Sequence, residues 1–339
     1  MSAPELVVFG CLTLDNVVTA EGVCLPQSFG GNCLYAALGA RLWCERVGIV
    51  SRCGADYPGA VFELLRETGI DAAGMTRLDR PHGRNVAFAY RADGSRTRAI
   101  PPEVLARIPP HERGRFVDTS LLPEANAKWL DFAPDVSDMP AAWWDSVRGI
   151  HDAYMPVERH GEIAAAVRAR PNRGIWMQID SPWHDRHRPS LDDAMELFEN
   201  VQAVLPSEAD VLDFRPGVGY EQTVEEMLRM GARIVTVKRG AAGSAVFERD
   251  KGLVAKIRAL EVTAVDPTGA GDAFCGGFLA GQLASGDPVT AARYGTVSAS
   301  FAVEAAGLGR LAHADRSEAR ARLAALAASR QSRRGSSRI

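Results

Sequence analysis

The chain has 339 residues, of which 46% are hydrophobic, so it can bury a large core and fits one large α/β domain with an insertion. Its formal net charge is −3, with both signs mixed, and this gives no indication of a nucleic-acid or membrane surface. No apolar run approaches the roughly 20 residues that span a bilayer. Residues 1–15 show neither a basic segment nor a cleavage-like site, so we expect a cytoplasmic protein.

Short apolar strands alternate with helical patterns along most of the chain. Leu34, Leu38 and Leu42, for example, recur at the i,i+4 spacing of one helix face. We predict strands at residues 6–9, 47–50, 128–132, 175–179, 203–205 and 233–238, and helices at residues 32–46, 60–68, 161–169, 223–230 and 291–304. This βαβα order predicts an α/β fold with a doubly wound, mostly parallel sheet and helices on both faces. Ligands bind beyond the carboxyl ends of the strands in such folds.

Two segments break this pattern. Residues from about 17 to 29 have no helical period, and residues 85–100 alternate in polarity before the turn signal Asp93-Gly94. We expect neither segment to belong to a parallel sheet. A second hairpin is predicted at residues 245–257. Residues 329–339 are rich in Arg and Ser and are predicted to be a disordered tail, so the predicted domain covers residues 1–328.

Cysteine and histidine do not form an evident metal-binding pattern. The six cysteines are scattered without a CxxC pair, which indicates reduced thiols. His184 and His187 have i,i+3 spacing but no evident third ligand. We therefore interpret them as part of a solvated loop rather than a metal site.

The run from Asp266 to Phe274 (Asp-Pro-Thr-Gly-Ala-Gly-Asp-Ala-Phe) is the most informative stretch of the chain. The glycines let an anion approach the backbone, and the first N–H groups of the following helix have no intrahelical partner. We therefore expect the N–H groups of Gly269, Ala270 and Gly271 to form an anion hole. Asp272 beside such a hole is explained if it accepts a proton from a hydroxyl that attacks a phosphoryl group.

A structural interpretation of the same run is also open. It can be a glycine-rich turn between a strand and a helix, in which Asp272 only complements the helix dipole. Taken alone, the run does not decide between the two interpretations.

Several separated motifs favour the functional interpretation of this run. The run resembles the signature of the ribokinase (PfkB) family of carbohydrate and nucleoside kinases. Gly30-Gly31-Asn32, residues 47–59 and residues 235–243 resemble that family as well, in the expected order. The resemblance implies a ribokinase-like fold in which segments 17–29 and 85–100 form a small β-lid. It also implies ATP and Mg²⁺ as cofactors, with a monovalent cation as a further candidate, and Asp272 as the catalytic base.

On the acceptor side, the resemblance assigns substrate hydroxyls to Asp15 and a close backbone approach to Gly30 and Gly31. Asn32 is expected to begin a helix. It can be the N-cap of that helix, a ligand contact, or both. An Asn of many sugar kinases falls on Tyr35 in this chain, and a phenol cannot replace a carboxamide. We therefore expect hydroxyl recognition at Tyr35 to be altered.

On the nucleotide side, an Asn and a Glu of the family fall on Ser207 and Asp210. Asp210 keeps the charge and is an indirect candidate for organising the metal. Ser207 is expected as a helix N-cap that can also face the nucleotide, and Glu208 is a further carboxylate. The candidate nucleotide-binding residues are Lys238, Gly240, Gly243, Thr268 and Ser207.

These features predict an ATP-dependent kinase that phosphorylates a hydroxyl of a sugar-like small molecule. A nucleoside kinase is the close alternative. A catalytically weak ligand-binding protein is the second, motivated by the departures at Tyr35 and Ser207. A dehydrogenase is excluded because no GxGxxG motif follows the first strand. An exposed face on the lid strands would allow a homodimer.

Overall fold

The computed structural model describes residues 2–19, 21–24, 27–90, 96–98, 100–122, 125–183 and 190–328. Three sequence predictions lie outside these residues: the Asp93-Gly94 turn, the loop containing His184 and His187, and the tail at residues 329–339. No helix within the described ranges is both long and apolar enough to cross a membrane.

The core of the fold is a nine-stranded sheet with the order β13-β12-β11-β10-β9-β8-β1-β4-β5. The strands from β11 to β5 run parallel, and β12 and β13 add an antiparallel hairpin at one edge. This confirms the predicted doubly wound sheet and its edge hairpin. The strands are β1 (Leu6–Phe9), β4 (Val47–Gly54), β5 (Asp71–Leu78), β8 (Gly149–Asp152), β9 (Trp176–Ile179), β10 (Ala203–Val204), β11 (Ile234–Lys238), β12 (Ser244–Glu248) and β13 (Gly252–Ile257).

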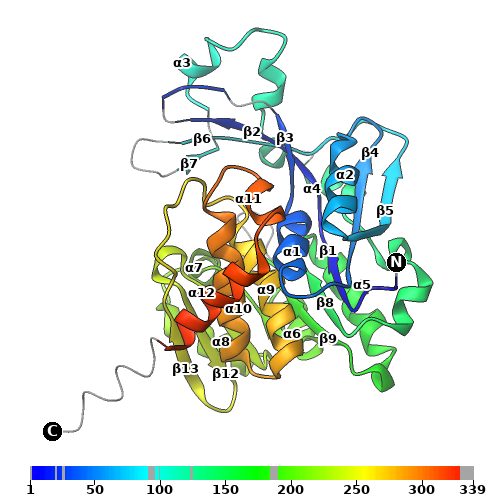
Figure 1. The fold of residues 1–339 in the computed structure, drawn as a ribbon, viewed down its shortest axis with the longest axis vertical. Helices are drawn as coiled ribbons and strands as arrows, with labels where there is room; N and C mark the ends of the chain where they lie inside the picture. Colours follow the sequence, from blue (N-terminus) through cyan, green and yellow to red (C-terminus); the bar gives the residue numbers. More distant parts are fainter. Residues whose placement is uncertain are drawn as a thin grey trace, which may run out of the picture.

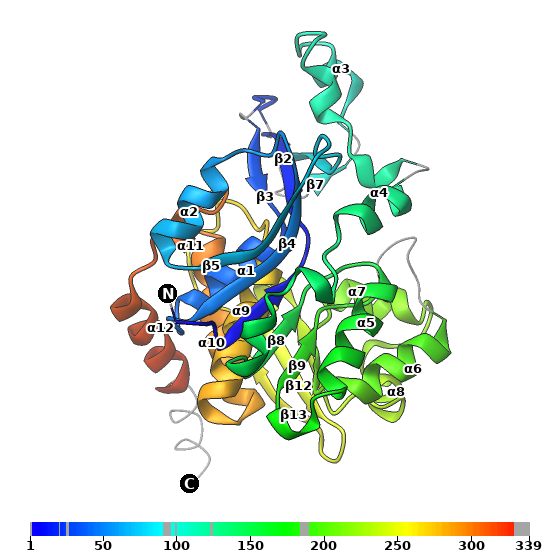
Figure 2. The same ribbon diagram turned by 90° about the vertical axis from the view of Figure 1, so that its right-hand side faces the viewer.

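Helices cover both faces of the sheet (Figure 2). One face carries α1 (Asn32–Arg41), α2 (Ala60–Thr68), α9 (Ala270–Ser285), α10 (Pro288–Ala302), α11 (Gly309–Ala312) and α12 (Arg316–Ala328). The other carries α5 (Val157–Arg168), α6 (Leu191–Asn200), α7 (Glu208–Phe214) and α8 (Tyr220–Arg229). Alternate residues of β1 enter the two cores, since Leu6 and Val8 pack with α1 and α9 whereas Val7 and Phe9 pack on the other side.

A separate four-stranded sheet lies at one end of the main sheet (Figure 1). Its order is β3-β2-β6-β7, with β2 (Thr13–Val18), β3 (Ser28–Gly30), β6 (Asn85–Tyr90) and β7 (Arg96–Thr97). We call this sheet the lid sheet. The short helix α3 (Pro102–Leu105) packs near it around Val18, Ala87 and Phe116. Both lid segments stay outside the main sheet, as expected. The prediction that neither joins a parallel pairing is wrong, because β2 pairs with β6 in parallel.

The structure also corrects the strand predicted at residues 128–132. These residues belong to the helix α4 (Ala125–Phe132). Trp129 and Phe132 are buried and lie three residues apart, which places them on one helix face, while Asp131 is exposed. A short apolar run does not separate a strand from a helix by itself.

Other boundaries differ modestly. Helix α1 ends at Arg41 rather than at residue 46, and strands β5 and β8 were not predicted. Strand β8 has the sequence Gly-Ile-His-Asp, so it lacks the apolar run that identified the other parallel strands. Short 3₁₀ helices complete the described chain: η1 (Arg113–Phe116), η2 (Thr119–Leu121), η3 (Val136–Asp138), η4 (Ala141–Asp145), η5 (Pro171–Arg173) and η6 (Gly240–Ala242).

Candidate active site

Most of the candidate residues gather where the parallel strands end. Asp152 and Lys238 are the last residues of β8 and β11, and Asp180 directly follows β9. The N-terminus of α9 lies at the same end, since Gly271 in its first turn approaches Lys238. Parallel α/β sheets bind ligands at this edge, so the fold places the predicted anion hole where a ligand is expected.

The N-terminus of α9 is open for a ligand. Gly269 is its N-cap, with the left-handed φ of 73°, and no side chain caps the helix. The Ala270 N–H donates to the Pro267 carbonyl oxygen at 3.3 Å. The N–H groups of Gly269 and Gly271 donate to no described residue. Of the three predicted donors, Gly269 and Gly271 are therefore the more available.

The loop before α9 is tied to the lid sheet. Asp266 is buried, and its Oδ1 accepts hydrogen bonds from the Thr268 N–H at 2.8 Å and from the Tyr90 hydroxyl. Tyr90 belongs to β6, and its hydroxyl also lies 3.3 Å from that of Thr268. Thr268 was predicted to contact the nucleotide. The structure places its side chain at this junction of loop and lid.

Tyr35 connects α1 to the anion hole. Its side chain is buried, and a Cβ built on Gly269 would lie 2.2 Å from the ring, so the ring packs directly on this glycine. The helices can approach this closely because Gly276 of α9 has no Cβ, which would lie 1.8 Å from the Ala36 carbonyl oxygen. Burial raises the pKa of Tyr35, and the charges of Asp15, Asp266 and Asp272 raise it further. Tyr35 therefore stays a neutral phenol.

Asp15 projects from β2 toward β3. Its Oδ1 accepts a hydrogen bond from the Thr13 hydroxyl at 2.7 Å, and a Cβ on Gly30 would lie 2.1 Å from its Oδ2. Tyr57 fixes these two strands, because its hydroxyl lies 3.0 Å from the Thr13 carbonyl oxygen and 3.1 Å from that of Gly30. Gly30 therefore makes room for the Asp15 carboxylate itself, whereas sequence reasoning assigned that space to a ligand.

The turn into α1 differs in one detail from its prediction. Gly31 is the N-cap of α1, with φ of 124°, and a Cβ there would lie 2.3 Å from the Cys11 carbonyl oxygen. Asn32 is the first helical residue, so its prediction as the N-cap is wrong. Its Oδ1 accepts the Cys11 N–H at 2.9 Å, and its Nδ2 donates to the Tyr154 carbonyl oxygen at 2.7 Å. Asn32 thus joins the loops that follow β1 and β8.

Lys238 lies beside the anion hole. Its Nζ is 2.7 Å from Asp180 Oδ1 and 3.5 Å from Cys275 Sγ, and a Cβ on Gly271 would lie 3.5 Å from it. Burial lowers the pKa of Lys238, but Asp180 and the other anionic groups, including Asp272, raise it above its usual value. A protonated amine therefore lies at the N-terminus of α9. Sequence reasoning missed Asp180, although a carboxylate directly after a predicted parallel strand was a usable signal.

The two glycines after β11 have different surroundings. A Cβ on Gly243 would lie 1.9 Å from the Ile257 carbonyl oxygen, so this glycine permits the edge hairpin to close. Gly240 has φ of 52° and no atom within 4 Å of its Cβ position. Of the pair, Gly240 leaves room for a ligand.

Ser207 and Asp210 form the capping box of α7. The Ser207 hydroxyl accepts the Asp210 N–H at 3.1 Å, and Asp210 Oδ2 accepts the Ser207 N–H at 2.7 Å. The predicted N-cap is therefore confirmed. Glu208 pairs with Arg239 at 3.0 Å. Across the described ranges, no group of three or more His, Cys, Asp or Glu side chains has the arrangement to hold a metal ion.

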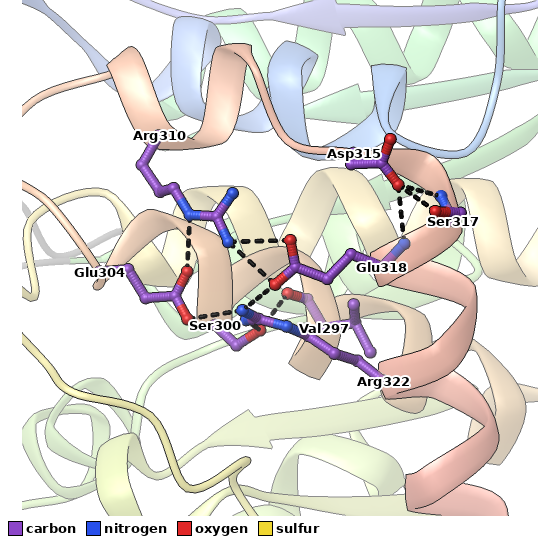
Figure 3. Close-up of polar contacts among 8 residues, drawn as sticks. All are labelled: Val297, Ser300, Glu304, Arg310, Asp315, Ser317, Glu318 and Arg322. Carbon is purple, nitrogen blue, oxygen red and sulfur yellow. Dashed lines mark hydrogen bonds and ion pairs between the residues drawn. The ribbon is translucent and has the colours of Figure 1, made fainter.

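A cluster of four charged side chains begins one residue after Val303, which binds the loop before α9. The Val303 carbonyl oxygen accepts the Val265 N–H at 2.7 Å and the Asp266 N–H at 3.2 Å. The next residue, Glu304, pairs with an arginine on each of two helices, and both arginines also bind one glutamate of α12 (Figure 3). The members of this buttress cluster are Glu304, Arg310, Glu318 and Arg322.

Comparison with known proteins agrees with this geometry. Residues 147–314 match the model of the pfkB family of carbohydrate kinases. A 5-dehydro-2-deoxygluconokinase of Bacillus velezensis is 34% identical over 88% of this chain and 88% of its own length. A cytidine kinase of Thermococcus kodakarensis is 24% identical over 82% of this chain and 88% of its own.

Solved structures show the same fold. Arabidopsis thaliana ribokinase, complexed with ribose and ATP, has a TM-score of 0.66 at 18% identity and covers 95% of this chain and 99% of its own. An Escherichia coli protein described as a ribokinase II, in complex with ATP and Mg²⁺, has a TM-score of 0.65 at 17% identity, with the same coverage. Together with the sequence relatives, these findings show that the chain belongs to the PfkB family of carbohydrate kinases.

Proposed function

We propose that this chain is an ATP-dependent kinase that phosphorylates a hydroxyl of a sugar-like small molecule, with Asp272 as the general base. The observation that carries the proposal is the placement of Asp272 in the first turn of α9. Its turn begins at an uncapped helix N-terminus, and Lys238 lies against the same turn. The charge of Asp272 also raises the pKa of both Tyr35 and Lys238.

The proposed reaction follows from these positions. Asp272 takes the proton of the acceptor hydroxyl as its oxygen forms a bond to the γ-phosphorus and the bond to the ADP oxygen breaks. The N–H groups of Gly269 and Gly271 and the ammonium of Lys238 stabilise the negative charge on the phosphoryl oxygens. Asp15 accepts hydrogen bonds from other hydroxyls of the acceptor and holds it in place.

The residues present fit ATP and Mg²⁺. The uncapped N-terminus of α9, with its αL glycine, provides donors for phosphate oxygens, and Lys238 adds a positive charge. Mg²⁺ binds mainly through phosphates and water, so a protein cluster of three acidic groups is not required. When bound, Mg²⁺ would neutralise phosphate charge. Asp210 remains our candidate for contacting it through water, and a monovalent cation remains a prediction.

Three further proposals concern the extent of the kinase domain, its location and its assembly. We propose that residues 1–328 form the kinase domain, with the lid sheet over the acceptor. The cytoplasmic location and the homodimer formed through the lid strands remain predictions. A nucleoside kinase is the second candidate, because the Thermococcus relative is a cytidine kinase.

Acceptor-dependent ADP formation tests the proposal. Purified protein with ATP and Mg²⁺ is supplied in turn with neutral sugars, deoxygluconates and nucleosides, and the phosphorylated product is identified by ³¹P NMR. We expect a sugar-type acceptor to stimulate ADP formation and to appear as its phosphate ester. Binding of such an acceptor without any phosphate transfer would support the ligand-binding alternative instead.

A further inference from the structure

Arg84 is an arginine beside the proposed acceptor side, and its guanidinium is bonded to no anionic side chain in the described part of the chain. It directly precedes β6, and its carbonyl oxygen accepts the Leu14 N–H of β2 at 2.9 Å. Its guanidinium lies over the Trp129 ring, 5.2 Å from the ring centre. The guanidinium itself makes no hydrogen bond or ion pair with any described residue. The residue is half-buried, and burial lowers the pKa of Arg84.

Arg159 is a second arginine with unused donor capacity. It lies in the first turn of α5, where a positive charge opposes the helix dipole. Its Nη1 binds both carboxylate oxygens of Glu162, at 3.0 and 2.8 Å. Its Nε is buried and has no hydrogen-bond partner in the described part of the chain. A buried donor without a partner, at a helix position unfavourable to a positive charge, is available to bind an anion.

Contacts connect Arg84 to the predicted acceptor residues. The Trp129 ring under Arg84 lies 4.8 Å from the Tyr154 ring, and the Tyr154 carbonyl oxygen binds Asn32. Burial raises the pKa of the Cys11 thiol, and the charges of Arg84 and Arg159 both oppose that rise. The chain order places Arg159 close to the same loops, because α5 begins at Val157, three residues after Tyr154.

The negative groups of this region do not account for these charges. Asp118 is the carboxylate whose charge acts on Arg84, and it pairs with Arg98 at 3.4 Å. Asp152 pairs with His160 at 2.7 Å, and burial raises its pKa. Glu162 engages only one nitrogen of Arg159. Within the described residues, these carboxylates therefore leave unused donors on both guanidinium groups.

We propose that Arg84 and Arg159 bind a carboxylate of the acceptor, so that the substrate is a sugar acid of the aldonate class rather than a neutral sugar or a nucleoside. This inference rests on the proposed kinase function. A planar guanidinium matches a carboxylate in shape and charge, and the pairing satisfies the buried Nε of Arg159. Asp15 then holds hydroxyls between this carboxylate and the hydroxyl that faces Asp272.

A carboxylate held by both arginines would also join two separate parts of the fold. Arg84 directly precedes strand β6 of the lid sheet, and Arg159 lies in the first turn of α5, a helix that covers the main sheet. A carboxylate bound by both would connect these two parts, and it would favour the lid position in which the acceptor is enclosed. Exclusion of water from the phosphoryl group is the usual consequence of such closure.

The test compares gluconate and 5-dehydro-2-deoxygluconate with their uncharged carboxamides, which keep the hydroxyls and remove the charge. Wild-type protein, Arg84→Gln and Arg159→Gln are assayed for acceptor-dependent ADP formation. One of the two acids will be the better substrate. We expect the wild type to prefer that acid over its own carboxamide by roughly 10- to 150-fold in kcat/KM. Each substitution should reduce that ratio about tenfold or more, mainly through the KM of the acid.

Matched controls come from neighbouring arginines. Arg80→Gln changes the same loop, but Arg80 is half-exposed and already pairs with Asp131 at 3.1 Å. Arg168→Gln changes the last turn of α5, where Arg168 bonds to Asn200. Both should keep the wild-type preference for the acid. Thermal unfolding of all variants shows whether each protein folds.

The outcomes separate the inference from the proposed function. Equal turnover of acid and amide by the wild type would leave the kinase intact and overturn the carboxylate site, as would a preference for fructose 1-phosphate over both acids. If no acceptor yields ADP, the kinase proposal fails. Calorimetric titration with the same acids still tests the carboxylate site in that case. Binding that Arg84→Gln and Arg159→Gln each abolish would support the site. Absence of binding to the wild type would contradict it.

Discussion

The ring of Tyr35 lies directly against the α-carbon of Gly269, the residue that caps the helix carrying Asp272. This contact joins α1, on the proposed acceptor side of the site, to α9, on its proposed phosphate side. Tyr35, for which we predict an effect on specificity, therefore has a structural role as well. Its ring fixes the position of Gly269 in the proposed anion hole.

Exchange of Gly269 for alanine tests this contact. Its Cβ would lie 2.2 Å from the Tyr35 ring at a φ of 73°, whereas a Cβ on Gly271 would meet only the Lys238 side chain at 3.5 Å. We expect Gly269→Ala to lose transfer activity by 10²-fold or more, because the ring or the loop must move. Gly271→Ala should fold normally and lose less. Similar activity of the two variants in a coupled ADP assay would contradict this account.

The carboxylate of Asp15 is expected to anchor the acceptor. Asp15→Ala should abolish the acceptor-dependent part of ADP formation and leave ATP affinity largely intact, since Asp15 lies on the lid strand β2 and not on α9.

Tyr35→Phe keeps the ring and should retain ATP binding, whereas Tyr35→Asn removes the ring and should destabilise the protein by roughly 2–4 kcal/mol. Calorimetry with ATP, together with urea unfolding, distinguishes these effects. Unchanged acceptor use by Asp15→Ala would remove it from the acceptor site.

The buttress cluster should affect both stability and nucleotide use. Arg322 and Glu304 are only 16% and 17% exposed, so removal of one partner leaves a poorly solvated charge. We expect Arg322→Met to lower the free energy of unfolding by roughly 1–3 kcal/mol and to raise the KM for ATP, because Val303 holds the loop at Asp266. Lys251→Met, which breaks an exposed pair with Glu248, is the control and should have little effect. An unaltered KM for ATP in Arg322→Met would separate the cluster from the loop.

Much of the fold could be predicted, because strands such as β1 and β11 are short apolar runs between helical patterns. Strand β8 could not, since its buried His151 and Asp152 depend on tertiary partners that no local pattern shows. The glycine-rich run gave the position of Asp272, but the partner of Lys238 lies 58 residues away in sequence. Arg84 and Arg159 carry no sequence motif, and only the structure shows that Arg84 lies over Trp129 and that the Arg159 Nε is buried without a partner in the described part of the chain.

Two buried histidines should make stability depend on pH. Burial lowers the pKa of His82 to about 4 and that of His151 to about 3, from 6.5. Between pH 6.5 and 5 the unfolded chain therefore binds more protons than the folded one, so stability falls as the pH falls, by roughly 2 kcal/mol for each histidine at pH 5.

Urea unfolding at pH 7.5, 6 and 5 measures this effect. His82→Gln should reduce the dependence, because the amide can accept the Gly54 N–H without titrating. His111→Gln changes an exposed side chain and should leave the dependence unaltered. A free energy of unfolding that is constant from pH 7.5 to 5 would show that these histidines are not held neutral.

The most direct test of the central claim is the rate of phosphoryl transfer by Asp272→Asn. The amide keeps the size of the side chain but cannot take a proton, so we expect kcat to fall roughly 10²- to 10⁴-fold while ATP still binds in a calorimetric titration. Asp192→Asn, which removes an exposed carboxylate from the first turn of α6, is the control for helix-dipole effects and should keep full activity. Near wild-type kcat in Asp272→Asn would contradict its role as the base.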